Sequence, residues 1–317
     1  MDMDDFAGNA LAPNVLTLES KLAELSAQER KGGRPALRYR FPLRGKTACG
    51  LSLLGLSGGE AAGLLAGFGF GPLLDQRERD VVFAQKTPLR HIALEQYSAA
   101  FKQAGLVSSS PLFIYSASPF VIMVNERHLG ARDIPHSWAE LTDKQYRGCM
   151  AITQEDAVGN VAAISLYAQL GEDGLEAFAQ NVARHASASV MPSLLEEDER
   201  ISVCVAPWFF ARIAAARPDI LCIWPEEGAL VFPLWLALRN DAPEGAQVVA
   251  DYFTSAEFAR ESARLCLPCA HIASDQVLDP DTHPLYWPGW EFFRTLDTGS
   301  YARAVTQAFA KSTKVVA

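Results

Sequence analysis

The stretch Pro135-His136-Ser137-Trp138-Ala139-Glu140-Leu141-Thr142-Asp143 carries the strongest fold signal in this chain. The proline sets the entry, and Ser137 belongs to the residue types that cap helices. Trp138 and Leu141 are spaced to pack on one face of the helix that follows. Taken alone, the stretch predicts a well-capped helix start.

The segments around it add to this signal through their order along the chain. Leu112–Asn125 is a long apolar run of strand-forming residues, and Met150–Ile152 is a short strand that leads into a polar loop and a helix. The later signals are, in chain order, Gly171-Glu172-Asp173-Gly174, Pro225-Glu226-Glu227-Gly228, Ala242-Pro243 and Ser255-Ala256-Glu257-Phe258. Because strand-like and helix-like segments alternate, the chain is expected to form an α/β fold with mainly parallel strand pairing.

In this order the segments resemble the extracellular solute-binding proteins of ABC transporters, of the ferric-iron and polyamine type. In that family a P-x-S-W-x-x-L helix enters the second lobe, and a P-x-x-G segment marks the return to the first. The resemblance covers roughly residues 112–270. It implies a two-lobed α/β fold of the periplasmic-binding-protein type 2, with a ligand cleft between the lobes and crossings near Tyr115–Val121 and Ile223–Pro233. We therefore expect residues 34–117 and 228–317 in lobe 1, residues 118–227 in lobe 2, and an appended helix and linker in residues 1–33.

Two loops offer polar groups where such a fold would bind a ligand. The loop that contains Asp156, Gly159 and Asn160 precedes a helix, whose free N–H groups could hold an anionic or polar group. The alternative is that Asp156 or Asn160 simply caps the helix. The second loop contains Arg44, Lys46 and Thr47, whose cationic and hydroxyl groups are either ligand contacts or surface side chains. The two crossings add three further candidate ligand residues: Ser116, Ser118 and Glu227.

The helix that begins Pro207-Trp208-Phe209-Phe210 departs from the family pattern. Ferric-binding members carry adjacent tyrosines there, whose phenolates ligate iron. Trp208 and Phe209 occupy the matching places, and neither ring has an anionic oxygen, so iron chelation by that route is not available. The two rings either stack on an organic ligand or a cation, or pack between helix and sheet.

The segment Cys266-Leu267-Pro268-Cys269-Ala270-His271 is the strongest feature outside the resemblance. Two thiols at this spacing can form a redox pair or serve as metal ligands, with His271 as a third ligand and Cys49 as a fourth. The rest of a zinc motif is missing. The competing interpretation is a pair of buried free thiols, as we expect for the other cysteines that lie in apolar runs.

Composition excludes some classes of function. The 317 residues carry a net charge of −9 and no Lys/Arg cluster, which argues against nucleic acid as a partner. The apolar, glycine-rich run Leu51–Leu74 contains Glu60 and is too interrupted for a membrane span, so we expect a buried helix followed by a loop. The acidic start Met1–Phe6 lacks the features of a signal peptide, which predicts a cytoplasmic location as written, or a periplasmic one if a signal was removed.

The sequence also predicts the structure of two segments outside the region of resemblance. Thr17–Arg30 is expected to form a helix with leucines on one face, packed either on the body or on a partner. The aromatic segment Tyr286–Phe293 is expected either to pack onto lobe 1 or to form an exposed patch that faces a partner.

Three functions follow from these expectations. The first is a binding module for a small polar or anionic ligand, with an ABC-transporter permease as partner and without a cofactor. The second is an enzyme on the same fold. The third is a cytoplasmic sensing domain that signals through the N-terminal helix. The residues considered for catalysis are Glu226, Glu227, His136, Cys266 and Cys269.

Overall fold

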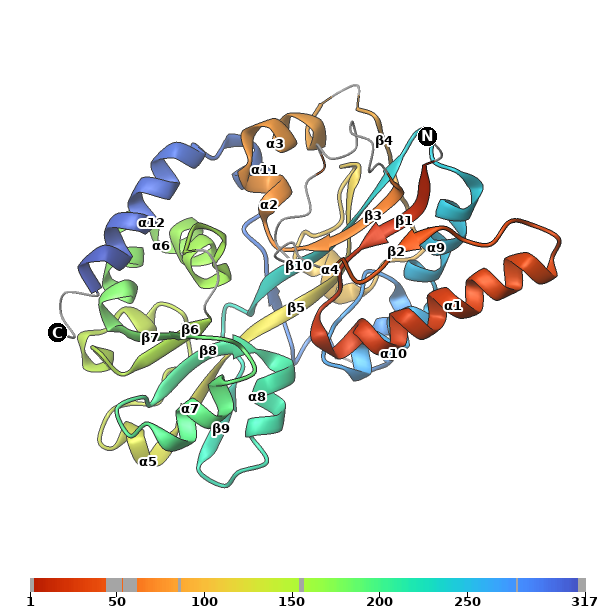
Figure 1. Cartoon of the computed structure of the whole chain (residues 1–317). Helices are drawn as coiled ribbons and strands as arrows, with labels where there is room; N and C mark the ends of the chain where they lie inside the picture. The colour runs from red at the N-terminus through yellow and green to blue at the C-terminus, as the bar shows by residue number, and fades with distance from the viewer. Residues whose placement is uncertain are drawn as a thin grey trace. The chain divides into compact units, whose positions relative to one another are not determined.

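A computed structural model describes residues 3–43, 53, 62–84, 87–153, 157–277 and 279–312. The chain divides into two compact units (Figure 1). Unit 1 comprises Met1–Ala117 and Phe232–Pro280, and unit 2 comprises Ser118–Val231 and Asp281–Ala317. The boundaries therefore fall inside two long strands, β5 (Leu112–Asn125) and β10 (Ala229–Arg239), and once more after Pro280.

Unit 1 contains a mixed sheet in the order β2-β1-β3-β10. β1 pairs in parallel with β2 and β3, whereas β3 runs antiparallel to β10. Helix α9 packs against β1 and β3. The elements are β1 (Asp4–Gly8), η1 (Ala12–Asn14), α1 (Val15–Lys31), β2 (Tyr39–Arg40), β3 (Ala62–Phe68), α2 (Gly71–Leu74), α3 (Gln76–Val82), β4 (Leu89–Arg90), α4 (Ala99–Gln103), α9 (Glu244–Phe253), α10 (Ala256–Arg264) and η7 (Ile272–Gln276).

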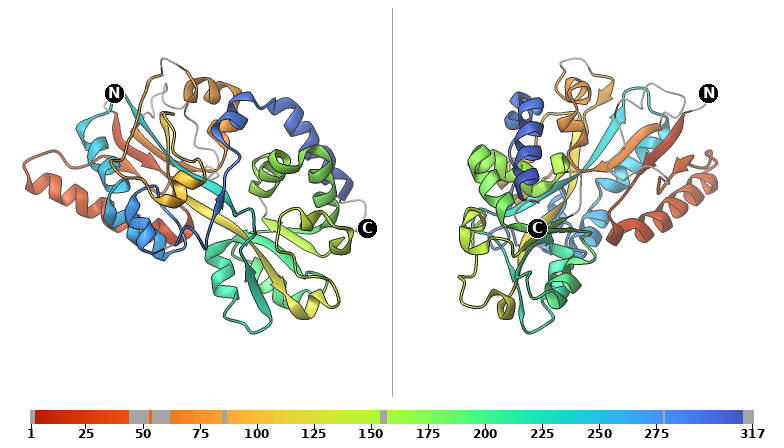
Figure 2. Two further views of the ribbon diagram at one scale, coloured as in Figure 1. Left: turned by 180° about the vertical axis from the view of Figure 1, so that it is seen from behind. Right: turned by 60° about the vertical axis from the view of Figure 1, so that its left-hand side comes forward.

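The strands of unit 2 follow the order β5-β8-β6-β7, with β9 also paired to β5. β8 and β9 run antiparallel to β5, and β6 is parallel to β7 and β8. Helix α12 lies along α6 (Figure 2). The elements are α5 (Glu126–Leu129), η4 (Glu140–Thr142), η5 (Lys144–Tyr146), β6 (Met150–Thr153), η6 (Ala157–Gly159), α6 (Val161–Asn181), β7 (Val182–Ala186), α7 (Met191–Glu197), β8 (Val203–Pro207), α8 (Trp208–Ala214), β9 (Ile220–Ile223), β11 (Leu285–Tyr286), α11 (Trp290–Thr295) and α12 (Thr298–Ser312).

The α/β class is therefore confirmed, and the strand pairing is mixed: of the nine described strand pairs five are parallel and four are antiparallel. β5 is antiparallel to β8 and β9, and β10 is antiparallel to β3 and β4 but parallel to β11. An apolar strand that is buried on both faces looks the same in the sequence whichever direction its neighbours run.

The helix expected within Leu51–Leu74 is also wrong for the described part of that run. Residues Ala62–Phe68 form strand β3, and all seven are buried. A short apolar run without alternation cannot be distinguished from a buried helix by its periodicity. The segment is a strand because it pairs with β1 and β10, and its two glycines allow close packing, since a Cβ on Gly63 or Gly67 would collide with Pro243 or with the Trp235 ring.

Both ends of the chain differ from the expected assignment. Helix α1 forms, with Leu18 and Leu22 buried, but β1 precedes it in the interior of the unit 1 sheet, so residues 1–33 are no appendage. The acidic pentapeptide Asp4–Gly8 carries no strand pattern, although Phe6 is fully buried. Residues Asp281–Ala317, which we placed in lobe 1, belong to unit 2, where α12 packs on α6.

Candidate functional site

Trp138 joins the two motifs that carry the resemblance. Its side chain is fully buried, and its indole N–H donates to the carbonyl oxygen of Gly228 at 2.8 Å. Its backbone N–H donates to the carboxylate of Glu227 at 3.1 and 3.2 Å, and the N–H of Glu226 donates to the carbonyl of His136 at 2.9 Å. These hydrogen bonds join the P-x-S-W segment (Pro135–Trp138) to the P-x-x-G segment (Pro225–Gly228) within unit 2, and we call this connection the Trp138 clamp.

The capping chemistry expected for the first motif is present, but the helix is short. Ser137 Oγ accepts from the N–H of Glu140 at 3.2 Å, and the Glu140 carboxylate accepts from the N–H of His136 at 2.7 Å. Only the 3₁₀ turn Glu140–Thr142 follows, because Asp143 then opens the second turn η5. Trp138 and Leu141 both pack inward, as the spacing predicts.

This clamp gives Glu227 a structural role that can be tested. Glu227→Ala is expected to lower the free energy of unfolding by about 1 kcal/mol, since it removes the acceptor of the Trp138 N–H. Urea denaturation measures the loss. Glu226→Ala is the matched control, because the Glu226 side chain makes no hydrogen bond to any described residue. Equal losses in both variants would contradict the clamp.

The loop before α6 is organised by Asn160. Its Nδ2 donates to the carbonyl of Thr153 at 3.1 Å, and its Oδ1 accepts from the N–H groups of Ala162 and Ala163 at 3.0 and 3.3 Å. The residue is 2% exposed. Asn160 thus caps α6, which is the alternative to a ligand role. Gly159 lies in the preceding 3₁₀ turn.

The other predicted ligand residues fall into two groups. Ser116 is fully buried and donates to the carbonyl of Pro268 at 2.9 Å, so its hydroxyl is already engaged in unit 1, and Ser118 is 2% exposed. The remaining residues of the two loops lie outside the described part of the chain, and their ligand role stays a prediction: Arg44, Lys46, Thr47 and Asp156.

The cysteine segment does not form a metal centre with described residues. Cys266 and Cys269 are free thiols that are 3% and 1% exposed. Burial raises the pKa of Cys269 to about 12. His271 Nδ1 accepts from the N–H of Ala273 at 3.0 Å and so caps η7. Among the described residues no three His, Cys, Asp or Glu side chains gather where they could hold a metal ion, and Cys49 lies outside them.

Thiol reactivity provides a test of this burial. In a Cys49→Ser background we expect Cys222, which is partly exposed, to react with Ellman's reagent in the native protein. Four buried thiols should react only after unfolding, because the reagent cannot reach their sulfur atoms, and added zinc should not change this result: Cys149, Cys204, Cys266 and Cys269. Fast reaction of a second thiol, or protection by zinc, would contradict the structure.

Three aromatic rings of unit 2 form a cluster, which we call the aromatic triad: Trp208, Trp224 and His283. The ring centroids of Trp208 and Trp224 are 5.1 Å apart, those of Trp224 and His283 are 4.7 Å apart, and those of Trp208 and His283 are 5.4 Å apart. All three side chains are partly exposed. Of the triad, only Trp208 was expected from the sequence.

Strand register explains how the triad assembles. β8 and β9 both run antiparallel to β5, with Pro207 opposite Phe120 and Ile223 opposite Ile122. The carboxyl ends of both strands therefore lie at the same edge, and Trp208 and Trp224 are the next residues along the chain. His283 is held there through Pro284, whose carbonyl accepts from the Trp224 indole N–H at 2.7 Å and from Ala229 N–H at 2.9 Å.

Phe209, the second aromatic residue at the start of α8, packs differently. Its ring lies 5.2 Å from that of Phe210 at an interplanar angle of 84°. Both rings are partly exposed. Phe209 thus belongs to a pair beside the triad.

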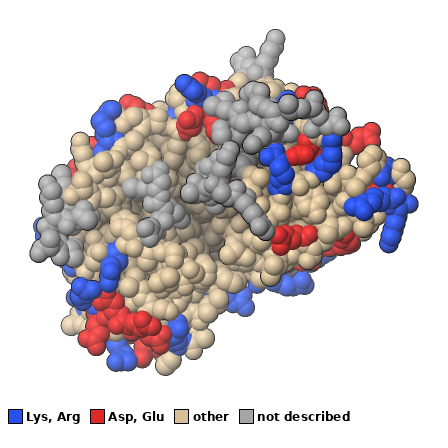
Figure 3. Space-filling model, viewed as in Figure 1, with Lys and Arg blue, Asp and Glu red and all other residues tan. Residues whose placement is uncertain are grey.

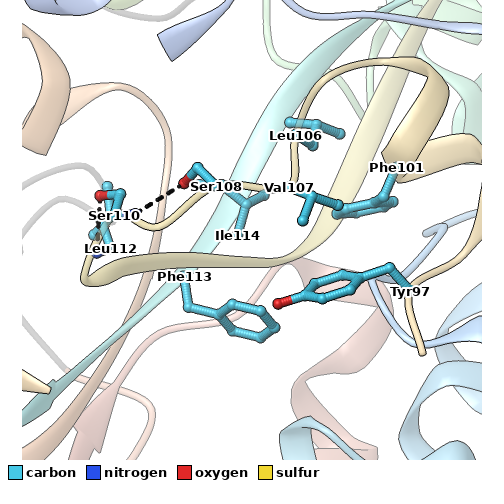
Figure 4. Close-up of a pocket in the computed structure, with 9 residues that line it drawn as sticks. All are labelled: Tyr97, Phe101, Leu106, Val107, Ser108, Ser110, Leu112, Phe113 and Ile114. Carbon is cyan, nitrogen blue, oxygen red and sulfur yellow. Dashed lines mark hydrogen bonds between the residues drawn. The ribbon is translucent and has the colours of Figure 1, made fainter. Parts of the chain in front are cut away.

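A small cavity in unit 1 does not fit a solute (Figure 4). It measures about 10 Å³, which is room for one water molecule. The rings of Tyr97, Phe101 and Phe113 line it, together with the loop of Ser108 and Ser110. None of the residues expected to bind a ligand lies there.

Charged side chains of both signs occur on the described surface. On the face shown in Figure 3, Lys and Arg side chains are interspersed with Asp and Glu side chains. Several form surface ion pairs, such as Asp198 with Arg184 and Arg200 at 3.2 and 2.9 Å.

Comparison with solved structures shows the fold. The periplasmic binding protein P5PA is 15% identical, with a TM-score of 0.64 over 98% of this chain and 99% of that one. The Trichodesmium protein IdiA (FutA), in complex with iron and citrate, is 16% identical, with a TM-score of 0.64 over 96% and 98%. AfuA from Actinobacillus pleuropneumoniae, with fructose-6-phosphate bound, is 14% identical, with a TM-score of 0.62 over 95% and 96%.

Comparison at the level of sequence shows the family. None of the curated proteins matches this chain significantly. Residues 66–296 match the family described as bacterial extracellular solute-binding protein, which is more than half of the 317 residues. The match includes the Trp138 clamp and all three residues of the triad. The chain therefore belongs to the bacterial extracellular solute-binding protein family.

Proposed function

We propose that this protein captures a small polar or anionic solute, releases it chemically unchanged, and serves an ABC transporter. The observation that carries the proposal is the family match over residues 66–296. It is supported by solved structures of the same fold that hold small solutes, namely fructose-6-phosphate in AfuA and iron with citrate in the Trichodesmium protein.

The aromatic triad is where we propose that the solute is held in unit 2. The start of α6 is the weaker candidate, because Asn160 already occupies the N–H groups of Ala162 and Ala163 that an anion would need. The Trp208 indole N–H, in contrast, donates to no described residue, and the ring is partly exposed. Trp208 and Phe209 provide no phenolate oxygen, so we propose an organic solute rather than a ferric ion.

Binding is favoured over catalysis by what the candidate catalytic residues do. The Glu227 carboxylate accepts a hydrogen bond from the Trp138 N–H, and the backbone of His136 is hydrogen-bonded to Glu140 and Glu226. Cys266 and Cys269 are buried, and burial raises the pKa of Cys269. None of these groups is arranged as a nucleophile with an adjacent base among the described residues.

Transport is favoured over signalling through the N-terminal helix. Helix α1 is part of unit 1, and Lys21 pairs with Glu257 of α10 at 2.9 Å. No described helix is long and apolar enough to cross a membrane. We propose a location outside the cytoplasmic membrane, in line with the family description, and a permease as the partner.

A thermal-shift screen tests the proposal. The purified chain is heated with oxyanions, sugar phosphates, carboxylates, amino acids, polyamines, metal ions and heterocyclic solutes. A solute present at 100 times its Kd is expected to add about 2.7 kcal/mol to the stability of the folded state, and Tm rises accordingly. A flat Tm across every class at millimolar concentration would contradict solute capture.

A further inference from the structure

The aromatic triad has a geometry that bears on the kind of solute, and the inference below rests on the proposed function. Trp208 and Trp224 meet edge to face at 90°, and Trp224 and His283 do so at 89°. Trp208 and His283 are nearer to parallel, with an interplanar angle of 35°. Because the rings hold one another in three directions, none can turn freely, and each stays partly exposed.

The polar atoms of the triad differ in whether they already have a hydrogen-bond partner within the described part of the chain. The indole N–H of Trp224 is used by the carbonyl of Pro284, and Nδ1 of His283 lies 2.8 Å from the Thr282 hydroxyl. The indole N–H of Trp208 donates to no described residue. Trp208 thus offers a ring and a hydrogen-bond donor, and its contacts with Trp224 and His283 position that ring.

We propose that the triad recognises a planar heteroaromatic ring carried by the solute. A flat ring stacks on an indole face in the offset geometry that aromatic pairs favour, and a ring heteroatom can accept from the Trp208 N–H. Trp208 is the contact residue, and Trp224 and His283 are positioning residues.

Matched pairs of solutes test the inference. Each pair differs only in the aromatic ring: adenosine 5′-monophosphate with ribose 5-phosphate, nicotinate with cyclohexanecarboxylate, and indole-3-acetate with acetate. The panel is extended by pyrimidine, imidazole and thiazole solutes, each with its saturated analogue. Titration calorimetry on the full chain is expected to show an aromatic member that binds at least about tenfold more tightly than its partner.

Variants connect that preference to the triad. Trp208→Leu is expected to raise the Kd of the aromatic member about tenfold or more, and Trp208→Phe to restore part of the affinity, because it returns a stacking ring without the N–H donor. His283→Ala is expected to give a smaller loss, because it removes only a support of the Trp208 ring. Phe210→Leu, on the same helix but outside the triad, is the control and should leave Kd unchanged. Circular dichroism and Tm verify that each variant folds.

The outcomes separate this inference from the proposed function. If saturated members bind as tightly as aromatic ones, or if Trp208→Leu leaves Kd unchanged, the inference is overturned while solute capture stands. Preference for polyamines or quaternary ammonium ions over heteroaromatic solutes would overturn it as well. If no solute of any class binds, both fail.

Discussion

Trp138→Ala is expected to lower the free energy of unfolding by about 3–5 kcal/mol, the largest effect of any single change considered for this protein. The Trp138 side chain is fully buried, and its indole N–H holds the carbonyl of Gly228 at 2.8 Å. Alanine leaves a large cavity and a buried carbonyl without its partner. Urea denaturation of both proteins, followed by circular dichroism, gives the difference.

Trp138→Phe separates the two contributions. It keeps most of the ring volume but removes the hydrogen bond to Gly228, so a smaller loss of about 1–2 kcal/mol is expected. If Trp138→Ala costs less than about 1 kcal/mol, the clamp between the two motifs does not stabilise the fold.

Gly67→Ala is expected to destabilise the protein by about 1–3 kcal/mol or more through overpacking. A Cβ at Gly67 would lie 2.4 Å from the ring of Trp235, which is 1% exposed and donates its indole N–H to Gly69. Neither side can yield easily, since the ring is enclosed and Gly67 lies in strand β3 of the unit 1 sheet.

Gly159→Ala is the matched control for Gly67→Ala. A Cβ there meets no atom of the described residues within 4 Å, and Gly159 does not have a positive φ. The effect of Gly159→Ala on the free energy of unfolding should stay within about 0.5 kcal/mol. Both variants are measured by thermal and urea denaturation. If Gly67→Ala is as stable as Gly159→Ala, the packing of β3 against Trp235 is contradicted.

The sequence predicted well those segments whose own residues favour only one kind of secondary structure. Leu112–Asn125 forms one strand with the expected bounds, because fourteen residues rich in β-branched and aromatic types have no helical competitor. Trp208 begins α8 as expected, since Pro207 ends a strand and cannot lie inside a helix. The family resemblance followed from the order of such segments.

The parts that it missed depend on contacts between distant residues. Ala62–Phe68 is a strand because it pairs with β1 and with β10, and β10 lies more than 160 residues further along the chain. Asn160 and Ser116 have side chains that suit a ligand or a structural hydrogen bond equally well, and only the positions of Thr153 and Pro268 show the structural use. Residue type alone could not separate these roles.

The triad shows the same limit for the candidate site. Trp208 was recognisable because it stands where the family carries a ligand residue. Trp224 and His283 had no such signal, since they are brought together by the carbonyl of Pro284 and by the pairing of β10 with β11. A conspicuous Trp-Pro after a strand and a His-Pro after an acidic loop were the available hints.

The central claim is that the protein binds a small solute and returns it unchanged. The most direct test is a calorimetric titration with the solute that raises Tm most, followed by mass spectrometry of the solute released on unfolding. We predict a single binding event with one solute per chain, and complete recovery at the original mass. Recovery of a chemically altered product in amounts that exceed the protein would contradict the claim and show an enzyme instead.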